Sequence, residues 1–172
     1  MKIKVLHITF LEAKAGIYFY LKELIDSQKS YGLDCHWIAV EKNNLFLTKK
    51  EILKKVIRIN PEIIHIHGAW RITTRMIFDF KKVTKNIIVS PHGMFNQESL
   101  KKSYEGKIIS WQYIKKILYL FFFEKRHLNH IRYFHALTKK ESEEIRLIFP
   151  KKPIKIINTG YEITPIKNFK VK

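Results

Sequence analysis

The sequence contains six short apolar runs, and a longer amphipathic or polar stretch separates each run from the next. Apolar runs of roughly four to eight residues are typical of buried strands, and the stretches between them have room for helices. Strict alternation of this kind predicts a mainly parallel sheet with helices on both faces. We therefore expect one α/β domain of the Rossmann-like, doubly wound class with a six-stranded sheet. The predicted strands are Ile3–Thr9, Cys35–Val40, Ile63–Ile66, Ile87–Ser90, Tyr133–Leu137 and Ile154–Ile157.

Several of the intervening stretches have the features of amphipathic helices. Thr48 stands three residues before Glu51, and Thr138 stands three residues before Glu141. This is the spacing of a capping box, so both threonines are expected to be helix N-caps. The predicted helices are Gly16–Lys29, Thr48–Arg58, Ile72–Val83 and Lys139–Leu147.

The region Leu100–His130 is the least ordinary part of the sequence, and it reads as one long helix or as two with a break. Its longest apolar stretch, Ile117–Phe123, is too short to span a bilayer. Three interpretations stay open: a helix that packs on the sheet, an interfacial helix that contacts a membrane, and a face for a partner protein. Trp111 and Phe121, with lysines and an arginine nearby, fit the interfacial helix loosely.

Length, cysteine content and charge limit the class of protein. At 172 residues the chain suits a single domain with a real core, and its one cysteine, Cys35, excludes an internal disulfide framework. A reducing cytoplasm is therefore the expected location. The formal charge of +18 comes mostly from dispersed lysines, without a zinc-finger, RNA-recognition or helix-turn-helix pattern. Specific nucleic-acid binding is not expected, and an anionic membrane surface or a phosphorylated ligand is favoured.

Two histidines end neighbouring apolar runs, and each is followed by glycine. His67 precedes Gly68, and His92 precedes Gly93. In an open parallel sheet, ligands bind at the carboxyl ends of the strands. Glycine after each histidine allows a sharp turn and a close approach of the backbone to a ligand. We therefore expect both imidazoles to lie on one rim and to face an open groove.

The other histidines are interpreted as structural. His7 and His65 lie within predicted buried strands, where a hydrogen-bonded core role is more common than ligand binding. His127, His130 and His135 lie on or after the basic fourth helical region, where solvent exposure and packing explain them. No cysteine or carboxylate has the spacing to complete a ligand set, so no metal site is expected.

The turn after the first predicted strand ends at Ala15 and Gly16, where the first predicted helix begins. Free backbone N–H groups at a helix N-terminus bind phosphate well, although an ordinary loop is an equally good interpretation. The turn is not a G-x-G-x-x-G fingerprint, and the chain contains no P-loop. Classical dinucleotide binding and nucleoside-triphosphate hydrolysis therefore lack their usual sequence support.

The order of these segments resembles the N-terminal half of a GT-B glycosyltransferase of the family 4 type. The likeness runs over Lys2–Glu162. The segments that carry it are the first strand with its glycine-ended turn, Ile64–Gly68, Ser90–Met94, Phe134–Glu141 and Ile156–Glu162.

In that family the N-terminal Rossmann-like domain mainly receives the acceptor, and a C-terminal domain binds the nucleotide sugar. The resemblance implies that His92 is the catalytic histidine that faces the reacting sugar. Ala15 and Gly16 stand where the family usually has Gly-Gly beside the donor diphosphate. The remaining implied residues are His67, Gly68, Trp70, Arg71 and Gly93 for the acceptor, and Thr159, Gly160 and Glu162 for the interdomain segment.

The resemblance also implies how the chain is organised. Residues 1–162 correspond to the glycosyltransferase domain, and residues 163–172 to a tail or a truncated interdomain linker. A donor domain needs roughly another 150–200 residues. The chain is therefore expected to be inactive as a transferase without a separate donor-binding domain.

The expected function is the acceptor-binding half of an enzyme that transfers sugar from a nucleotide-sugar donor to a polysaccharide or lipid-linked acceptor. The donor is a co-substrate, and no metal or other cofactor is expected. We expect a cytoplasmic location, and peripheral attachment to the inner face of the cell membrane is compatible with it. The alternative is a non-catalytic, membrane-associated module that binds a lipid phosphate or a partner.

Overall fold

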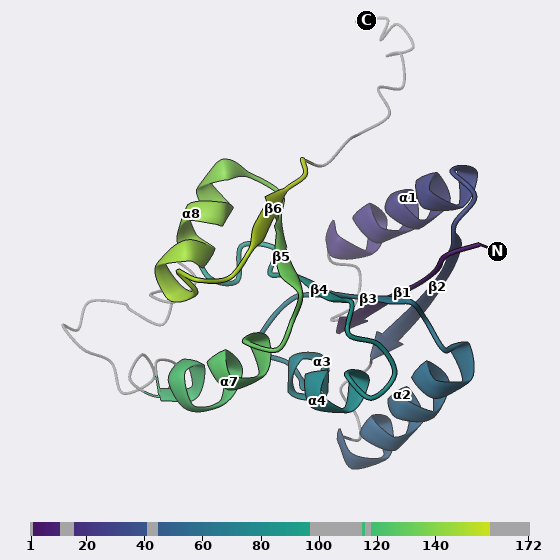
Figure 1. Ribbon diagram of the computed structural model, residues 1–172, viewed down its shortest axis with the longest axis horizontal. Helices are drawn as coiled ribbons and strands as arrows, with labels where there is room; N and C mark the ends of the chain where they lie inside the picture. The colour runs from purple at the N-terminus through teal and green to yellow at the C-terminus, as the bar shows by residue number, and fades with distance from the viewer. Residues whose placement is uncertain (1, 11–15, 41–44, 97–114, 116–117, 159–172) are drawn as a thin grey trace, which may run out of the picture.

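The structure, a computed structural model, describes residues 2–10, 16–40, 45–96, 115 and 118–158. It contains one six-stranded sheet in the order β2-β1-β3-β4-β5-β6, and every neighbouring pair is parallel (Figure 1). The predicted Rossmann-like α/β class is confirmed. The expected tail, residues 163–172, lies outside the described residues. The strands are β1 Lys4–Phe10, β2 Asp34–Val40, β3 Ile63–His67, β4 Ile87–Ser90, β5 Tyr133–Ala136 and β6 Ile154–Ile156.

The helices follow the predicted order with two corrections. Thr48 lies inside α2, because strong helix formers such as Leu45 extend the helix one turn earlier than the capping box indicated. The helix predicted over Ile72–Val83 is two short helices separated by Met76, whose ψ of 2° leaves the helical range. The bounds in this part of the chain are α1 Gly16–Ser30, α2 Leu45–Ile59, α3 Ile72–Arg75 and α4 Ile77–Phe80.

The second half of the chain contributes η1 Leu120–Glu124, a π-helical segment that runs directly into α7 Lys125–Leu128, and then α8 Lys139–Ile148. Thr138 caps α8 as predicted, because its side-chain oxygen accepts a hydrogen bond from the Glu141 backbone N–H. Much of the region Leu100–His130 lies outside the described residues. Of the described helices, none is long and apolar enough to cross a membrane.

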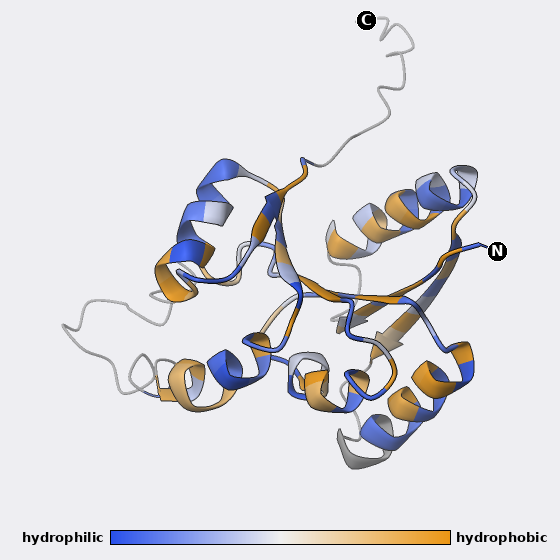
Figure 2. Cartoon of the chain, in the orientation of Figure 1, coloured by the Kyte–Doolittle hydropathy of each residue, from blue (hydrophilic) through white to orange (hydrophobic). Residues whose placement is uncertain are grey.

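The two faces of the sheet differ in chemistry. Because side chains alternate between faces along a strand, one face carries only apolar residues from the central strands. That face packs against α2, α3, α4 and α7, which lie on the opposite side of the sheet from α1 (Figure 1). Figure 2 shows hydrophobic residues along the central strands and a mixture of hydrophobic and hydrophilic residues in α1 and α2. The apolar face is formed by Leu6, Ile8, Ile64, Ile66, Ile87, Val89, Phe134 and Ala136.

The other face lies beneath α1 and is polar along the middle of the sheet. A small apolar cluster of Val5, Ile25 and Cys35 fills it near β2. Burying polar groups is unfavourable unless each finds a hydrogen-bond partner, so this face must contain a connected polar network. Its members are His7, Thr9, His65, His67, Ser90 and His135.

Candidate functional site

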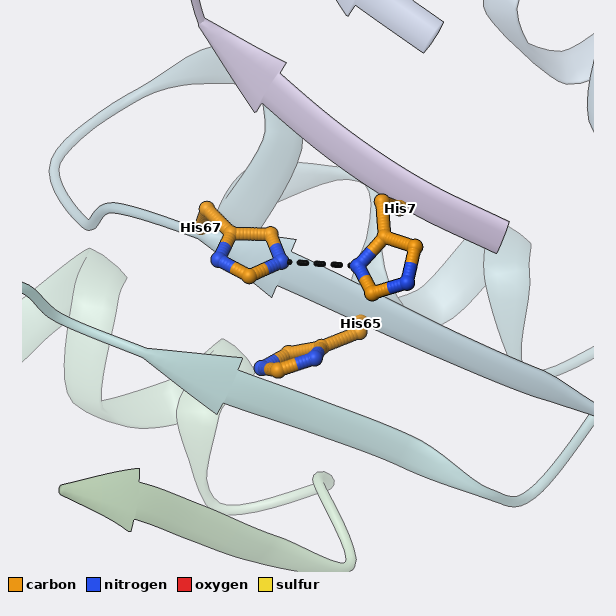
Figure 3. A group of neighbouring side chains, drawn as sticks. All are labelled: His7, His65 and His67. Atoms are coloured by element: carbon orange, nitrogen blue, oxygen red, sulfur yellow. Dashed lines mark hydrogen bonds between the residues drawn. The ribbon is translucent and has the colours of Figure 1, made fainter. Parts of the chain in front are cut away.

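Strand register brings three histidines together on the α1 side of the sheet. His7 of β1 pairs in register with His65 of β3, and His67 follows two residues later on the same face. The ring centroids of His65 and His67 are 4.0 Å apart, and those of His7 and His67 are 5.3 Å apart. Figure 3 shows the three rings converging from the two strands. We call them the histidine triad.

A chain of hydrogen bonds leads from α1 through the triad to the edge of the sheet. Gln28 Oε1 lies 2.8 Å from His7 Nε2, and His7 Nδ1 lies 3.0 Å from His67 Nε2. His67 Nδ1 lies 3.0 Å from His92 Nε2. Because an amide oxygen only accepts, His7 donates to Gln28, and each neutral ring donates from Nε2 to the Nδ1 of the ring before it. His92 Nδ1 is then left as a hydrogen-bond acceptor at the end of the chain.

A second chain fixes the protonation of His65. His135 Nε2 lies 3.0 Å from the carbonyl oxygen of Ile157, which can only accept. Ser90 Oγ therefore donates to His135 Nδ1 at 2.8 Å and accepts from His65 Nε2 at 2.7 Å. The proton of a neutral His65 is thus on Nε2, and its Nδ1 keeps a free lone pair.

Burial keeps these imidazoles neutral. Desolvation, followed by the neighbouring imidazoles, holds the pKa of His65 and of His67 well below the usual value. Desolvation also lowers the pKa of His7, against a smaller raising effect of Gln28, and lowers the pKa of His92 to about 4. All four rings are therefore uncharged at neutral pH, as the two hydrogen-bond chains require.

The expectation that both His67 and His92 face an open groove is wrong for His67. The His67 side chain is buried, with 2% of the residue exposed, whereas His92 is half-buried. The reason is that β3 continues through His67, which points between the sheet and α1, and the Tyr20 ring packs against both imidazoles. His135 is also buried, in β5, so solvent exposure does not explain this histidine.

His92 lies in a strained turn that a distant carboxylate holds. Its φ is 53°, and the φ of Gly93 is 72°, so two successive residues occupy the left-handed region. The backbone N–H of Gly93 donates to Glu141 Oε1 at 2.8 Å, and that of Leu137 donates to Glu141 Oε2 at 2.7 Å. Glu141 thereby ties the His92 turn to the start of α8 and fixes the direction of the imidazole.

The neighbouring turn after β3 is equally constrained. Gly68 has a φ of 99°, and a Cβ built on it would lie 3.2 Å from Met94 Cε. Trp70, with a φ of 62°, donates its backbone N–H to Glu124 Oε1 and its indole N–H to the Met94 carbonyl oxygen. Gly68 and Trp70, both predicted to bind an acceptor, therefore also stabilise the conformation of this turn.

The remaining predicted residues are only partly described. Gly16 is the first residue of α1, and a Cβ built on it would meet no atom within 4 Å, so the space beside it is open. The Arg71 guanidinium carbon lies 4.7 Å from the centroid of the Phe10 ring, at the carboxyl end of β1. Ala15, Thr159, Gly160 and Glu162 lie outside the described residues.

A pocket of about 850 Å³ lies beside the triad, between α1, strands β3 to β5 and the residues Ile157 and Asn158 that follow β6. His65 and His135 form part of its wall on the sheet. On the α1 side its wall includes Gln28 and two carboxylates, Glu23 and Asp26. His65, whose Nδ1 keeps a free lone pair, therefore borders this pocket.

The triad could hold a metal ion, which the sequence did not indicate. Each of the three rings offers one ligand nitrogen, and these three atoms lie within 4.8 Å of one another. The sequence offers no cysteine or carboxylate at ligand spacing, whereas strand register brings together three imidazoles from two strands.

The sequence gives no sign that Gln28 and Ser90 belong to this network, and it indicates only a capping role for Glu141. The usable signal was the placement of histidines at alternate positions, His65 and His67, in a strand expected beside the one that carries His7. Alternation predicts a shared face, but only the register sets which histidines meet.

No protein-family model matches the chain, and no curated protein matches it. The likeness to glycosyltransferases therefore depends on the order of the motifs and stays a prediction.

Proposed function

We propose that this domain is the acceptor-side half of a glycosyltransferase that moves sugar from a nucleotide-sugar donor to a polysaccharide or lipid-linked acceptor. In this proposal another domain binds the donor. The observation that carries it is the position of His92, at the carboxyl edge of β4 in a left-handed turn that Glu141 holds. Ligands of open α/β sheets bind at this edge, where the connections from β1 and β3 diverge.

The chemistry of His92 suits contact with sugar hydroxyls. Its Nε2 donates to His67, and its Nδ1 has no protein partner among the described residues. A neutral ring in this state accepts a hydrogen bond from a hydroxyl and orients the sugar relative to the departing diphosphate oxygen. His67 is buried behind it, so we assign His67 a positioning role rather than contact with the acceptor. The charge of +18 favours a phosphorylated substrate.

The proposal is tested in cells that lack the gene and receive it back in variant form. His92→Ala should restore less than about a tenth of the wild-type transfer, because a positioned hydrogen-bonding or proton-transferring group contributes on the order of 100-fold or more. The measurement is incorporation of labelled sugar into the lipid-linked and polysaccharide fractions.

The matched control is His130→Ala, since the His130 side chain lies away from the triad, near Lys81 and Phe78. It should restore full incorporation at equal protein level. Full restoration by His92→Ala would refute the catalytic assignment. Unchanged incorporation in the deletion strain would refute the transferase proposal as a whole.

A second candidate function rests on exposed aromatic residues in η1. Phe121, Phe122 and Phe123 are between 55% and 68% exposed, and Leu118 beside them is 48% exposed. Contiguous apolar patches are uncommon on soluble surfaces and mark interaction sites. The Lys125 ammonium lies 4.9 Å from the Phe121 ring centroid. Aromatic residues with cations beside them fit the headgroup region of an anionic membrane, which supports a membrane-associated binding module.

Vesicle flotation tests this second candidate. The protein should float with vesicles that contain phosphatidylglycerol and much less with phosphatidylcholine alone. Phe122→Asp should weaken this binding by about ten-fold or more, because a charge enters the apolar patch. Phe19→Asp, which changes a similarly exposed phenylalanine on α1, should not. Equal loss in both variants, or no flotation of the wild type, would rule out this membrane surface.

A further inference from the structure

The histidine triad has the ligand atoms of a metal site already arranged. His7 Nδ1 and His67 Nε2 face each other across 3.0 Å. Two nitrogen ligands at roughly 2.0–2.1 Å from a tetrahedral ion stand about 3.3 Å apart, so this pair needs only a small opening. The third nitrogen, on His65, lies within 4.8 Å of the others and must approach by roughly 1–1.5 Å, which tilting of the ring can supply.

The hydrogen bonds behind the triad match those behind metal-ligating histidines. Such histidines usually donate their second ring N–H to a protein acceptor, which fixes the ring and its tautomer. His7 donates from Nε2 to Gln28, and His65 donates from Nε2 to Ser90. The lone pairs of both rings are therefore on Nδ1. His65 Nδ1 has no hydrogen-bond donor among the described residues, so it is a ligand atom without a present partner.

The surroundings decide which ion fits. Three imidazole nitrogens suit Zn²⁺ and neighbouring transition metals, whereas Mg²⁺ and Ca²⁺ require oxygen ligands that the triad does not offer. Neutral ligands leave the ion's charge uncompensated, and Glu23 and Asp26 line the pocket that His65 also borders. Of the triad, His65 lines this pocket, so we expect the ion to enter from the His65 side.

We propose that His7, His65 and His67 form a binding site for Zn²⁺ or a similar transition-metal ion. The proposal is independent of the transferase function. The ion takes the place of the proton shared by His7 and His67, so the proton of His67 moves to Nδ1 and is donated to His92 Nε2. His92 then carries its own proton on Nδ1. Metal occupancy thus converts the outward nitrogen of His92 from a hydrogen-bond acceptor into a donor.

The test uses untagged protein, because a histidine tag binds the same ions. After removal of metal with a chelator, the protein is titrated with Co²⁺, whose visible absorption reports tetrahedral nitrogen ligation. One equivalent should bind, and Zn²⁺ should displace it. His65→Gln should weaken binding by about 100-fold or more. Ser90→Ala, which removes the acceptor behind His65, should weaken it by about ten-fold.

His130→Gln is the matched control, and it should bind as the wild type does. A second measurement covers variants that fold poorly: imidazole ¹⁵N spectra of the wild type with and without Zn²⁺. Shifts at the triad and a proton on His92 Nδ1 support the site. Absence of Co²⁺ absorption, binding that survives His65→Gln, or shifts confined to His127 and His130 would each overturn it.

Discussion

Lowering the pH from 6.5 to 4 should remove about 2–3 kcal/mol from the free energy of unfolding of the metal-free domain. The pKa of His92 is about 4 in the folded protein, against about 6.5 in the unfolded chain, and this difference is equivalent to about 3 kcal/mol. The unfolded chain takes up the proton first, so stability is complete above pH 6.5 and declines as the pH falls towards 4. The lowered pKa values of His7, His65 and His67 act in the same direction.

One buried carboxyl group opposes this trend. Burial raises the pKa of Glu124, against a smaller lowering effect of the hydrogen bond from the Trp70 backbone N–H. The folded protein therefore protonates Glu124 before the unfolded chain protonates the same residue, which favours folding as the pH falls. The raised pKa of Glu124 reduces the loss of stability in acid, and the large shift of His92 keeps the net effect of acid destabilising.

The measurement is urea denaturation followed by circular dichroism at a series of pH values in the presence of a chelator. His92→Gln provides the matched control, because it removes one titrating ring. Its free energy of unfolding should fall less between pH 6.5 and 4 than that of the wild type, by up to about 3 kcal/mol. A wild-type stability that stays constant over this range would contradict the neutral, buried state of the rings. An identical pH dependence of stability in His92→Gln and the wild type would contradict it as well.

Local patterns in the sequence were sufficient for the fold. Each predicted strand overlaps an observed one, and β4 matches its predicted bounds, Ile87–Ser90, at both ends. Apolar runs mark buried strands because both faces of a parallel sheet are covered. The error of one residue at the end of β3 had a larger consequence. It placed His67 on the rim, whereas the residue completes the strand and points beneath α1.

The site depended on contacts between residues far apart in the chain. His7 and His67 are 60 positions apart, and they meet because β1 and β3 pair in a particular register. Strand propensity and hydrophobic periodicity give no information on the register between two strands that are not adjacent in sequence. The capping box at Thr138 and Glu141 shows the same limit. Its local hydrogen bond was predicted, but the carboxylate contact to Gly93, 48 positions away, was not.

That contact makes Glu141 the residue whose loss should most affect the His92 turn. Glu141→Ala is expected to lower the free energy of unfolding at pH 7.5 by about 3–4 kcal/mol. The carboxylate is buried and accepts the backbone N–H groups of Gly93 and Leu137. Its removal leaves two donors unsatisfied, at about 1–3 kcal/mol each. A negative charge at the start of α8 is lost as well, and it interacts favourably with the helix dipole.

Two further substitutions distinguish the hydrogen bonds of Glu141 to Gly93 and Leu137 from a general effect of negative charge on α8. Glu141→Gln keeps an oxygen for Gly93 but turns an amide N–H₂ towards the Leu137 N–H, so it should lose about half as much stability. Glu143→Ala, on the exposed side of the same helix, should cost less than about 0.5 kcal/mol. Amide hydrogen exchange at Gly93 and Leu137 should accelerate in Glu141→Ala alone. If Glu141→Ala is as mild as Glu143→Ala, the carboxylate does not hold the turn, and the direction of the His92 ring must have another cause.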